Sequence, residues 1–218
     1  MTRAGIAAGR RIRWLAAVAT AIGLAAGAAP AVTAQTRDPV GGLAVDVRGL
    51  TVSLPTTAGW TPAVLSATSI VPGRGWGAEA GAHVVFGPGR HRRLGLGATG
   101  LWAQGQATGI DAATVTTRLT AVAPHVSWNF GHRLGWSYVS GGAGVARIAS
   151  QEVGGTSDPG GWGAAFHYGG GARWFVTDRL ALSLDLRFWA LTPRGAIGDR
   201  PNAPATTRVA VGAGVALR

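Results

Sequence analysis

The chain has 218 residues, a formal net charge of +11, only 13% charged residues, 36 glycines and no cysteine. The lack of cysteine excludes disulfides and thiolate metal sites, and the length is that of one domain. All twenty basic residues are arginine, but no run of basic residues is longer than Arg90-His91-Arg92-Arg93 and no nucleic-acid-binding motif occurs. The positive charge therefore does not predict a nucleic-acid partner.

The first 34 residues have the order of a secretory signal peptide. Four arginines precede an apolar run from Trp14 to about Ala29, and Pro30 and the small residues Val32-Thr33-Ala34 follow. The run is shorter than the roughly 20 residues that a membrane-spanning helix needs. We therefore expect a signal peptide helix over 1–34, export by the general secretory route, and a mature domain over 35–218 with a net charge of +7.

Eight later segments alternate apolar and polar residues with the period of two that a β-strand has. Glycine, proline, asparagine and aspartate separate them. The expected strands are 42–54, 75–87, 92–105, 114–130, 133–149, 162–177, 179–192 and 206–217. Even-numbered strands end in short turns and odd-numbered strands in longer loops. This asymmetry is typical of membrane-spanning β-barrels, whose turns and loops lie on opposite sides of the membrane.

The segment 162–191 shows the two faces of such a strand most clearly. From Leu180 to Phe188 every second residue is apolar, and Ser183, Asp185 and Arg187 lie between them. A soluble barrel would put the apolar face inside. Eight strands enclose an interior only just wide enough for side chains, so inward aromatic residues on most strands would overfill it. We therefore expect the polar face to line the lumen and the apolar face to contact lipid.

Two sets of residues follow from these faces. The first is a structural network of polar lumen residues, since isolated charges are costly in a confined interior. Its members are Asp46, Arg48, Glu79, His83, His125, His167, Arg173, Asp185 and Arg187. The second is a set of aromatic residues at the membrane interfaces. Its members are Trp76, Trp102, Trp128, Trp136, Tyr138, Trp162, Tyr168 and Trp174. The phase stays open around Pro124, where a bulge would change it, and beyond Tyr138.

Four stretches carry a resemblance to a known family: GWGAEAGAHVVFG (75–87), APHVSWNFGHRLGWSYVSGGAG (123–144), YGGGARWFVTDRLALSLDLRFWAL (168–191) and VAVGAGVALR (209–218). On these the chain resembles bacterial outer-membrane β-barrel proteins of the small eight-stranded class, the superfamily that contains the OmpA-type membrane domain. The resemblance implies an all-β, antiparallel, up-and-down transmembrane barrel in a Gram-negative outer membrane. It also implies outer-membrane lipid and the barrel assembly machinery as partners. Family members commonly end in an aromatic residue, whereas this chain ends in Leu217-Arg218.

Motifs that would indicate chemistry are sparse. A GxGxxG motif begins at Gly95, but strand residues follow it in place of the helix of a dinucleotide site. The five histidines show no close ligand pairing, so we expect neither a metal nor a cofactor. His125 and Ser127 share a face, as His and Ser do in outer-membrane lipid A deacylases, but Trp128 breaks the deacylase-type pattern of His, any residue, Ser and Asn.

These observations favour a non-enzymatic barrel with a plugged polar lumen. Its specific role, structural or in binding an extracellular ligand, would then be carried by the outer loops. A narrow porin-like channel or small-ligand carrier is the alternative, because the inward glycines could leave a continuous gap. A deacylase-like hydrolase is the remote alternative.

Overall fold

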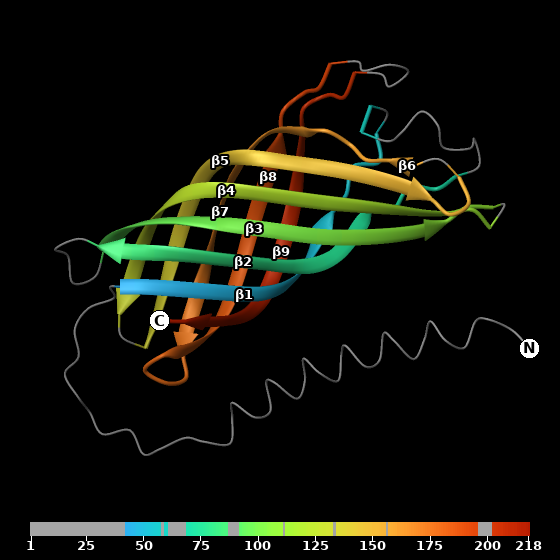
Figure 1. The fold of residues 1–218 in the computed structure, drawn as a ribbon. Coiled ribbons are helices and arrows are strands. Elements are labelled where there is room, and N and C mark those ends of the chain that lie inside the picture. The colour runs from blue at the N-terminus through green and yellow to red at the C-terminus, as the bar shows by residue number, and fades with distance from the viewer. Residues whose placement is uncertain are drawn as a thin grey trace, which may run out of the picture. The chain divides into compact units, whose positions relative to one another are not determined.

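Eight long antiparallel strands form a closed barrel (Figure 1). They are β1 Gly42–Ser53, β2 Arg74–Phe86, β3 Arg92–Thr108, β4 Thr114–His132, β5 Gly135–Glu152, β7 Trp162–Phe175, β8 Leu180–Leu191 and β9 Thr206–Leu217. A two-residue strand, β6 Ser157–Asp158, pairs with the end of β5. The first long strand, β1, pairs with both β2 and β9, so the sheet closes on itself. The predicted eight-stranded antiparallel barrel is confirmed.

The computed structural model describes residues 42–57, 59–60, 69–86, 92–110, 112–132, 134–155, 157–195 and 202–218. All of the strands lie within one unit, Arg37–Arg218. No helix in the described part of the chain is long and apolar enough to cross a membrane. The signal peptide expected over 1–34 lies outside the described residues.

Three strands run further than the apolar alternation predicts. β3 continues to Thr108 and β5 to Glu152, and these ends pair with the start of β4. β4 itself continues at its other end to His132. The outward positions of β3 near Thr108 are polar, at Gln104 and Gln106. The apolar pattern therefore ends there, while the antiparallel backbone pairing continues because it does not depend on side-chain polarity.

Pro124 lies in the middle of β4 without a bulge. The pair Val122↔Val145 before it and the pair His125↔Gly142 after it have the same register. Pro124 faces outward and is exposed. The inward phase of β4 therefore continues unbroken to His125 and beyond.

The outward face of the barrel is apolar on all eight long strands. Most of its large apolar side chains are 37 to 67% exposed, because alternate residues of a strand face opposite sides of the sheet. Among them are Val45, Val47, Val84, Leu96, Trp102, Val126, Val139, Val145, Phe166, Trp174, Leu182, Leu184, Leu186 and Val211. A soluble protein rarely exposes a contiguous apolar surface of this extent.

The interior has three layers, which the inward residues of β1 cross in order. Ala44 belongs to a turn-end cluster, Asp46 and Arg48 to a charged layer, and Leu50 and Val52 to a loop-end cluster. The turn-end cluster is Ala44, Val85, Trp136 and Tyr138, with Phe175 packed against it. The loop-end cluster is Leu50, Val52, Leu54, Trp60, Leu101, Ala103, Leu119, Ala121, Ala123, Ala146, Ile148, Ala165, Trp189, Leu191, Ala203 and Ala210. Apolar packing therefore covers the charged layer on both sides.

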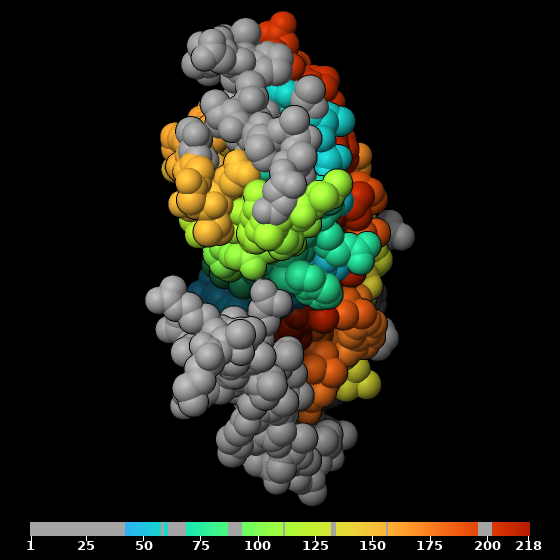
Figure 2. Space-filling model, turned by 90° about the vertical axis from the view of Figure 1, so that its right-hand side faces the viewer, coloured from blue at the N-terminus to red at the C-terminus, as the bar shows by residue number. Residues whose placement is uncertain are grey.

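The first and last loops meet over the loop-end cluster. The indole N–H of Trp60 donates to the carbonyl of Pro204 at 2.7 Å, and the Arg194 guanidinium lies over the Trp60 ring at 4.6 Å. Figure 2 shows described residues of the first loop (cyan) beside those of the last (red). Gly59 has a φ of +86°, and a Cβ there would lie 2.2 Å from the carbonyl oxygen of Asn202. Only glycine therefore permits this approach of the two loops.

Closure of the barrel between β1 and β9 gives a first prediction. Val47 and Val215 are direct partners, and both face outward. Because the chain has no cysteine, the double variant Val47→Cys/Val215→Cys should form one disulfide on oxidation, detected as a mobility shift on a non-reducing denaturing gel. The control Val47→Cys/Ala216→Cys should form none, since Ala216 faces inward. Equal cross-linking of both pairs would contradict the register.

Candidate functional site: a charged layer inside the barrel

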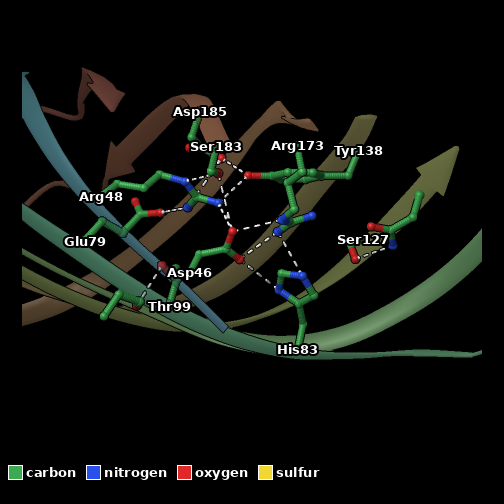
Figure 3. A network of polar contacts seen from close by, with 12 residues as sticks. Asp46, Arg48, Glu79, His83, Thr99, Ser127, Tyr138, Arg173, Ser183 and Asp185 are labelled. Atoms are coloured by element: carbon green, nitrogen blue, oxygen red, sulfur yellow. Dashed lines mark hydrogen bonds and ion pairs between the residues drawn. The ribbon is translucent and has the colours of Figure 1, made fainter. Parts of the chain in front are cut away.

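Six charged side chains from four strands meet inside the barrel between the two apolar clusters, and all but Arg187 are labelled in Figure 3. They are Asp46 and Arg48 on β1, Glu79 on β2, Arg173 on β7, and Asp185 and Arg187 on β8. Each is at least 94% buried. Successive residues of a strand face opposite sides, so a spacing of two places each pair on β1 and β8 inward together. Three guanidinium groups therefore balance three carboxylates.

Arg48 lies at the centre of this layer. Its Nη2 contacts the Asp46 carboxylate at 2.7 Å and its Nη1 donates to Glu79 at 2.9 Å. Its Nε donates to the Ser183 hydroxyl at 2.8 Å, and Nη2 also donates to the Tyr138 hydroxyl at 3.0 Å. The Tyr138 hydroxyl in turn donates to Asp185. One guanidinium thereby connects β1, β2, β5 and β8.

Arg173 holds the second half of the layer. It binds Asp46 with two hydrogen bonds, from Nε at 2.9 Å and from Nη2 at 2.7 Å. Its Nη2 also lies 2.9 Å from Nε2 of His83. The guanidinium lies over the Tyr138 ring at 4.3 Å and near the Trp136 ring at 5.4 Å. Aromatic faces thus stabilise the cation on the side that the carboxylate does not reach.

Arg187 completes the layer on β8. Its Nε and Nη2 each donate to the Asp185 carboxylate at 3.1 Å, and Nη2 lies 3.6 Å from Glu79. A bidentate arginine–carboxylate pair is among the stronger polar interactions in proteins. Each carboxylate of the layer therefore contacts at least two guanidinium groups.

A row of three histidines extends from the charged layer toward β7. The ring centroids of His83 and His125 lie 5.9 Å apart, and those of His125 and His167 lie 5.6 Å apart. The His167 ring also packs on Trp189 at 4.9 Å. Both ring nitrogens of His167 are buried without a hydrogen-bond partner among the described residues. Glycine makes room for this row, because a Cβ on Gly97 would lie 2.4 Å from the Cβ of His83.

The charged layer leaves little open space. One cavity lined by Asp46, Arg173, Arg187, His83 and His125 has a volume of about 10 Å³. That is the space for about one water molecule. The described interior therefore resembles a packed core more than a pore.

The nine residues predicted for the polar lumen network all lie inside the barrel and are buried. His125 is the most exposed at 8%. Six of the eight predicted interface aromatic residues face outward and are about half exposed or more. These are Trp76, Trp102, Trp128, Trp162, Tyr168 and Trp174.

The prediction for Trp136 and Tyr138 is wrong. Both lie inside the barrel and are 3% and 4% exposed. Tyr138 pairs with Asn129 across the β4–β5 turn, and directly paired residues share one face of a sheet. Asn129 is buried, so Tyr138 must be buried too. Space for its ring comes from Gly171, where a Cβ would lie 2.6 Å from the Tyr138 hydroxyl.

Sequence reasoning also missed the apolar ends of the lumen. Trp189 is fully buried, because it continues the inward phase that Asp185 and Arg187 establish on β8. Trp60 lies in the first loop, where no strand period predicts its direction. The parity of β8 could have identified Trp189, whereas Trp60 required the tertiary contacts.

The geometry gives the deacylase hypothesis no support. His125 and Ser127 both face inward and are buried, away from any substrate at the outer surface. The Ser127 hydroxyl accepts a hydrogen bond from Asn129 at 2.9 Å. No described hydrogen bond joins His125 to Ser127 or to a carboxylate. Among the described residues, no group of three or more His, Asp or Glu side chains is placed to hold a metal ion.

Neither a protein-family model nor a curated protein matches the chain. Among solved structures, Neisserial surface protein A aligns with a TM-score of 0.53 at 12% identity, over 81% of this chain and 96% of that chain. The fold is that of a small eight-stranded barrel. Ail, the attachment invasion locus protein of Yersinia pestis, aligns at 0.49 and 11% identity over 81% and 99% of the two chains. The outer membrane protein OprG from Pseudomonas aeruginosa aligns at 0.42 and 11% identity over 83% and 97%.

The charged layer predicts a large effect of removing one charge. Asp46→Asn leaves Arg173 without its bidentate carboxylate, so the free energy of unfolding should fall by about 3–5 kcal/mol. The measurement is urea unfolding of the protein in detergent micelles, followed by tryptophan fluorescence. The exposed Arg74→Gln variant should change the free energy by less than about 0.5 kcal/mol.

A double variant separates the charge effect from general disruption. Asp46→Asn/Arg173→Met removes one charge of each sign and restores the balance of the layer. It should be more stable than the sum of the two single effects by about 0.5–3 kcal/mol. Strict additivity would show that the two side chains do not act as a pair.

Proposed function

We propose that this chain is a non-enzymatic outer-membrane β-barrel protein of the small OmpA-like class. Its eight long strands cross the membrane, its lumen is plugged, and the segments at the loop end act at the cell surface. The segment 1–34 serves as a cleaved signal peptide for export by the general secretory route, and the barrel assembly machinery inserts the domain 35–218.

One observation carries the proposal: the polarity of the wall is inverted relative to a soluble barrel. Apolar side chains on all eight long strands are exposed, while the charged side chains of the middle of the barrel are buried. In water this arrangement would be unfavourable on both counts. In a bilayer the exposed face contacts hydrocarbon, and the closed sheet satisfies its own backbone groups.

The packed interior supports a plug in preference to a channel. The turn-end cluster and the loop-end cluster both fill the lumen with apolar side chains, and ion pairs cross it between them. An ion would have to break these contacts to pass. No specific observation among the described residues favours the porin-like alternative.

If the lumen is plugged, a specific role of the protein depends on the loop end. The strands β1, β3, β5 and β8 end on the opposite side of the barrel from β2, β4 and β7, and the longer connecting loops follow β1, β3, β5 and β8. The rigid barrel holds these loops in place, as scaffolds with variable loops commonly do. We propose that any extracellular ligand binds there.

The membrane location is tested by fractionation and by heat-modifiability. The protein should sediment with outer-membrane fractions, and an unboiled sample should migrate differently from a boiled one on a detergent gel, because the closed barrel survives detergent until it is heated. A soluble periplasmic protein with identical mobility before and after boiling would overturn the proposal.

The plug is tested by conductance in planar bilayers. The refolded protein should show no steady unitary currents, since the lumen is filled at both ends and in the middle. A known porin in the same bilayer serves as the positive control. Steady unitary currents from the heat-modifiable form would assign the channel function in place of the plug.

A further inference from the structure

The outward charges whose side chains the structure describes lie at the loop end of the barrel. Among the outward positions of the eight long strands whose side chains are described, three are charged: Arg74, Arg118 and Arg147. All three lie toward the loop end of their strands, and none of the described outward positions carries a carboxylate. The loop-side rim of the wall is therefore positive.

Arg118 and Arg147 are close neighbours on this rim. Thr120 on β4 pairs directly with Arg147 on β5, which places Arg118, two residues from Thr120, diagonally opposite Arg147. Diagonal partners lie ~7–8 Å apart, within reach of long side chains. Figure 2 shows the ends of β4 (lime) and β5 (amber) at the loop end of the barrel.

Aromatic residues flank the two arginines on the neighbouring strands. Trp102 on β3 pairs with Thr120, Thr120 pairs with Arg147, and Arg147 pairs with Trp162 on β7. These four residues therefore lie on one row across the strands, and Arg118 lies two residues from it toward the loop end. Both indoles are exposed. Tryptophan prefers the level where lipid headgroups begin. This row therefore marks the headgroup level on this side of the barrel.

The described contacts of both arginines are made through Nε. Arg118 Nε donates to the Gln104 side chain at 2.9 Å, and Arg147 Nε donates to the carbonyl of Pro159 at 2.6 Å. These bonds orient the planar guanidinium groups and leave their Nη atoms for a ligand. Asp158, the nearest carboxylate in the chain to Pro159, accepts a hydrogen bond from the backbone N–H of Gly160 at 2.9 Å.

The surroundings of the two arginines match the three parts of a phosphorylated glycolipid. Toward the turn end, exposed Val122, Val145 and Phe166 offer apolar surface to acyl chains. Toward the loop end, the amides and hydroxyls of Gln106 and Thr116 suit sugar hydroxyls, and they hydrogen-bond each other at 3.2 Å. Between these levels, arginine is the residue that binds phosphate with two parallel hydrogen bonds.

We infer that Arg118 and Arg147 form a binding site for the phosphate group of a phosphorylated glycolipid in the outer leaflet. The inference rests on the proposed outer-membrane function, which places the loop end outward. An isolated arginine near a membrane interface is tolerated and would indicate nothing. Two diagonal arginines between two tryptophans, on a wall without described carboxylates, present a shaped anion site.

The test is native mass spectrometry of the purified full chain in detergent, with diphosphoryl lipid A as the probe. The wild-type protein should retain one lipid A, and Arg118→Gln/Arg147→Gln should lower the apparent affinity by at least about tenfold, since each lost charge-assisted contact costs a large factor. Arg118→Lys/Arg147→Lys keeps the charge but loses the planar fork, so its affinity should be intermediate.

Arg74→Gln is the matched control, because it removes one outward positive charge away from this pair and should bind as the wild type does. Equal loss in Arg74→Gln, or unchanged binding in Arg118→Gln/Arg147→Gln, would overturn the inference. Phosphatidylglycerol binding as tightly as lipid A, or full competition by millimolar inorganic phosphate, would also overturn it by assigning the site to another phosphate source.

Heat-modifiability of every sample separates this inference from the proposed function. A wild-type chain that is not heat-modifiable would count against the membrane barrel itself. A heat-modifiable wild-type chain that does not retain lipid A would overturn the lipid site and leave the barrel intact.

Discussion

The barrel depends on the charge balance of one buried layer. Asp46, Arg48, Glu79, Arg173, Asp185 and Arg187 lie between two apolar clusters, where an unpaired charge would cost several kcal/mol. The cost is offset because every carboxylate of the layer meets more than one guanidinium. Arg173 and Asp46 are 127 positions apart in the chain, so the pair forms only when β1 and β7 belong to one closed sheet. The same contacts that satisfy the charges also specify the closure.

This constraint explains the division of the molecule into a packed interior and an apolar outer wall. The lumen is occupied by side chains that need one another, which leaves the described interior no continuous path for solutes. The proposed function therefore places interaction with other molecules at the outer wall and the loop end. On the wall, apolar residues face outward along the strands, and the described outward charges appear only at the loop-side rim.

The alternation of apolar and polar side chains was enough to predict most of the fold and most of the charged layer. A period of two located all eight strands, and the nine residues predicted for the polar face are buried because they alternate with the apolar residues of their strands. It failed on β5, where small residues at Gly141 and Gly142 carry little information about phase. A two-residue turn, at either 131–132 or 133–134, pairs odd positions of β4 with even positions of β5. That parity places Trp136 and Tyr138 inside, and it was available in the sequence.

The sequence by itself determined the eight strands and the two faces of most of them, because both follow from local spacing. Only the tertiary structure decided which charge meets which, how Tyr138 connects Arg48 to Asp185, and that Trp60 and Trp189 close the loop end with apolar packing. Those features depend on the register between strands that are distant in the chain and on the width of the closed barrel. Neither quantity is encoded in the period of any single strand.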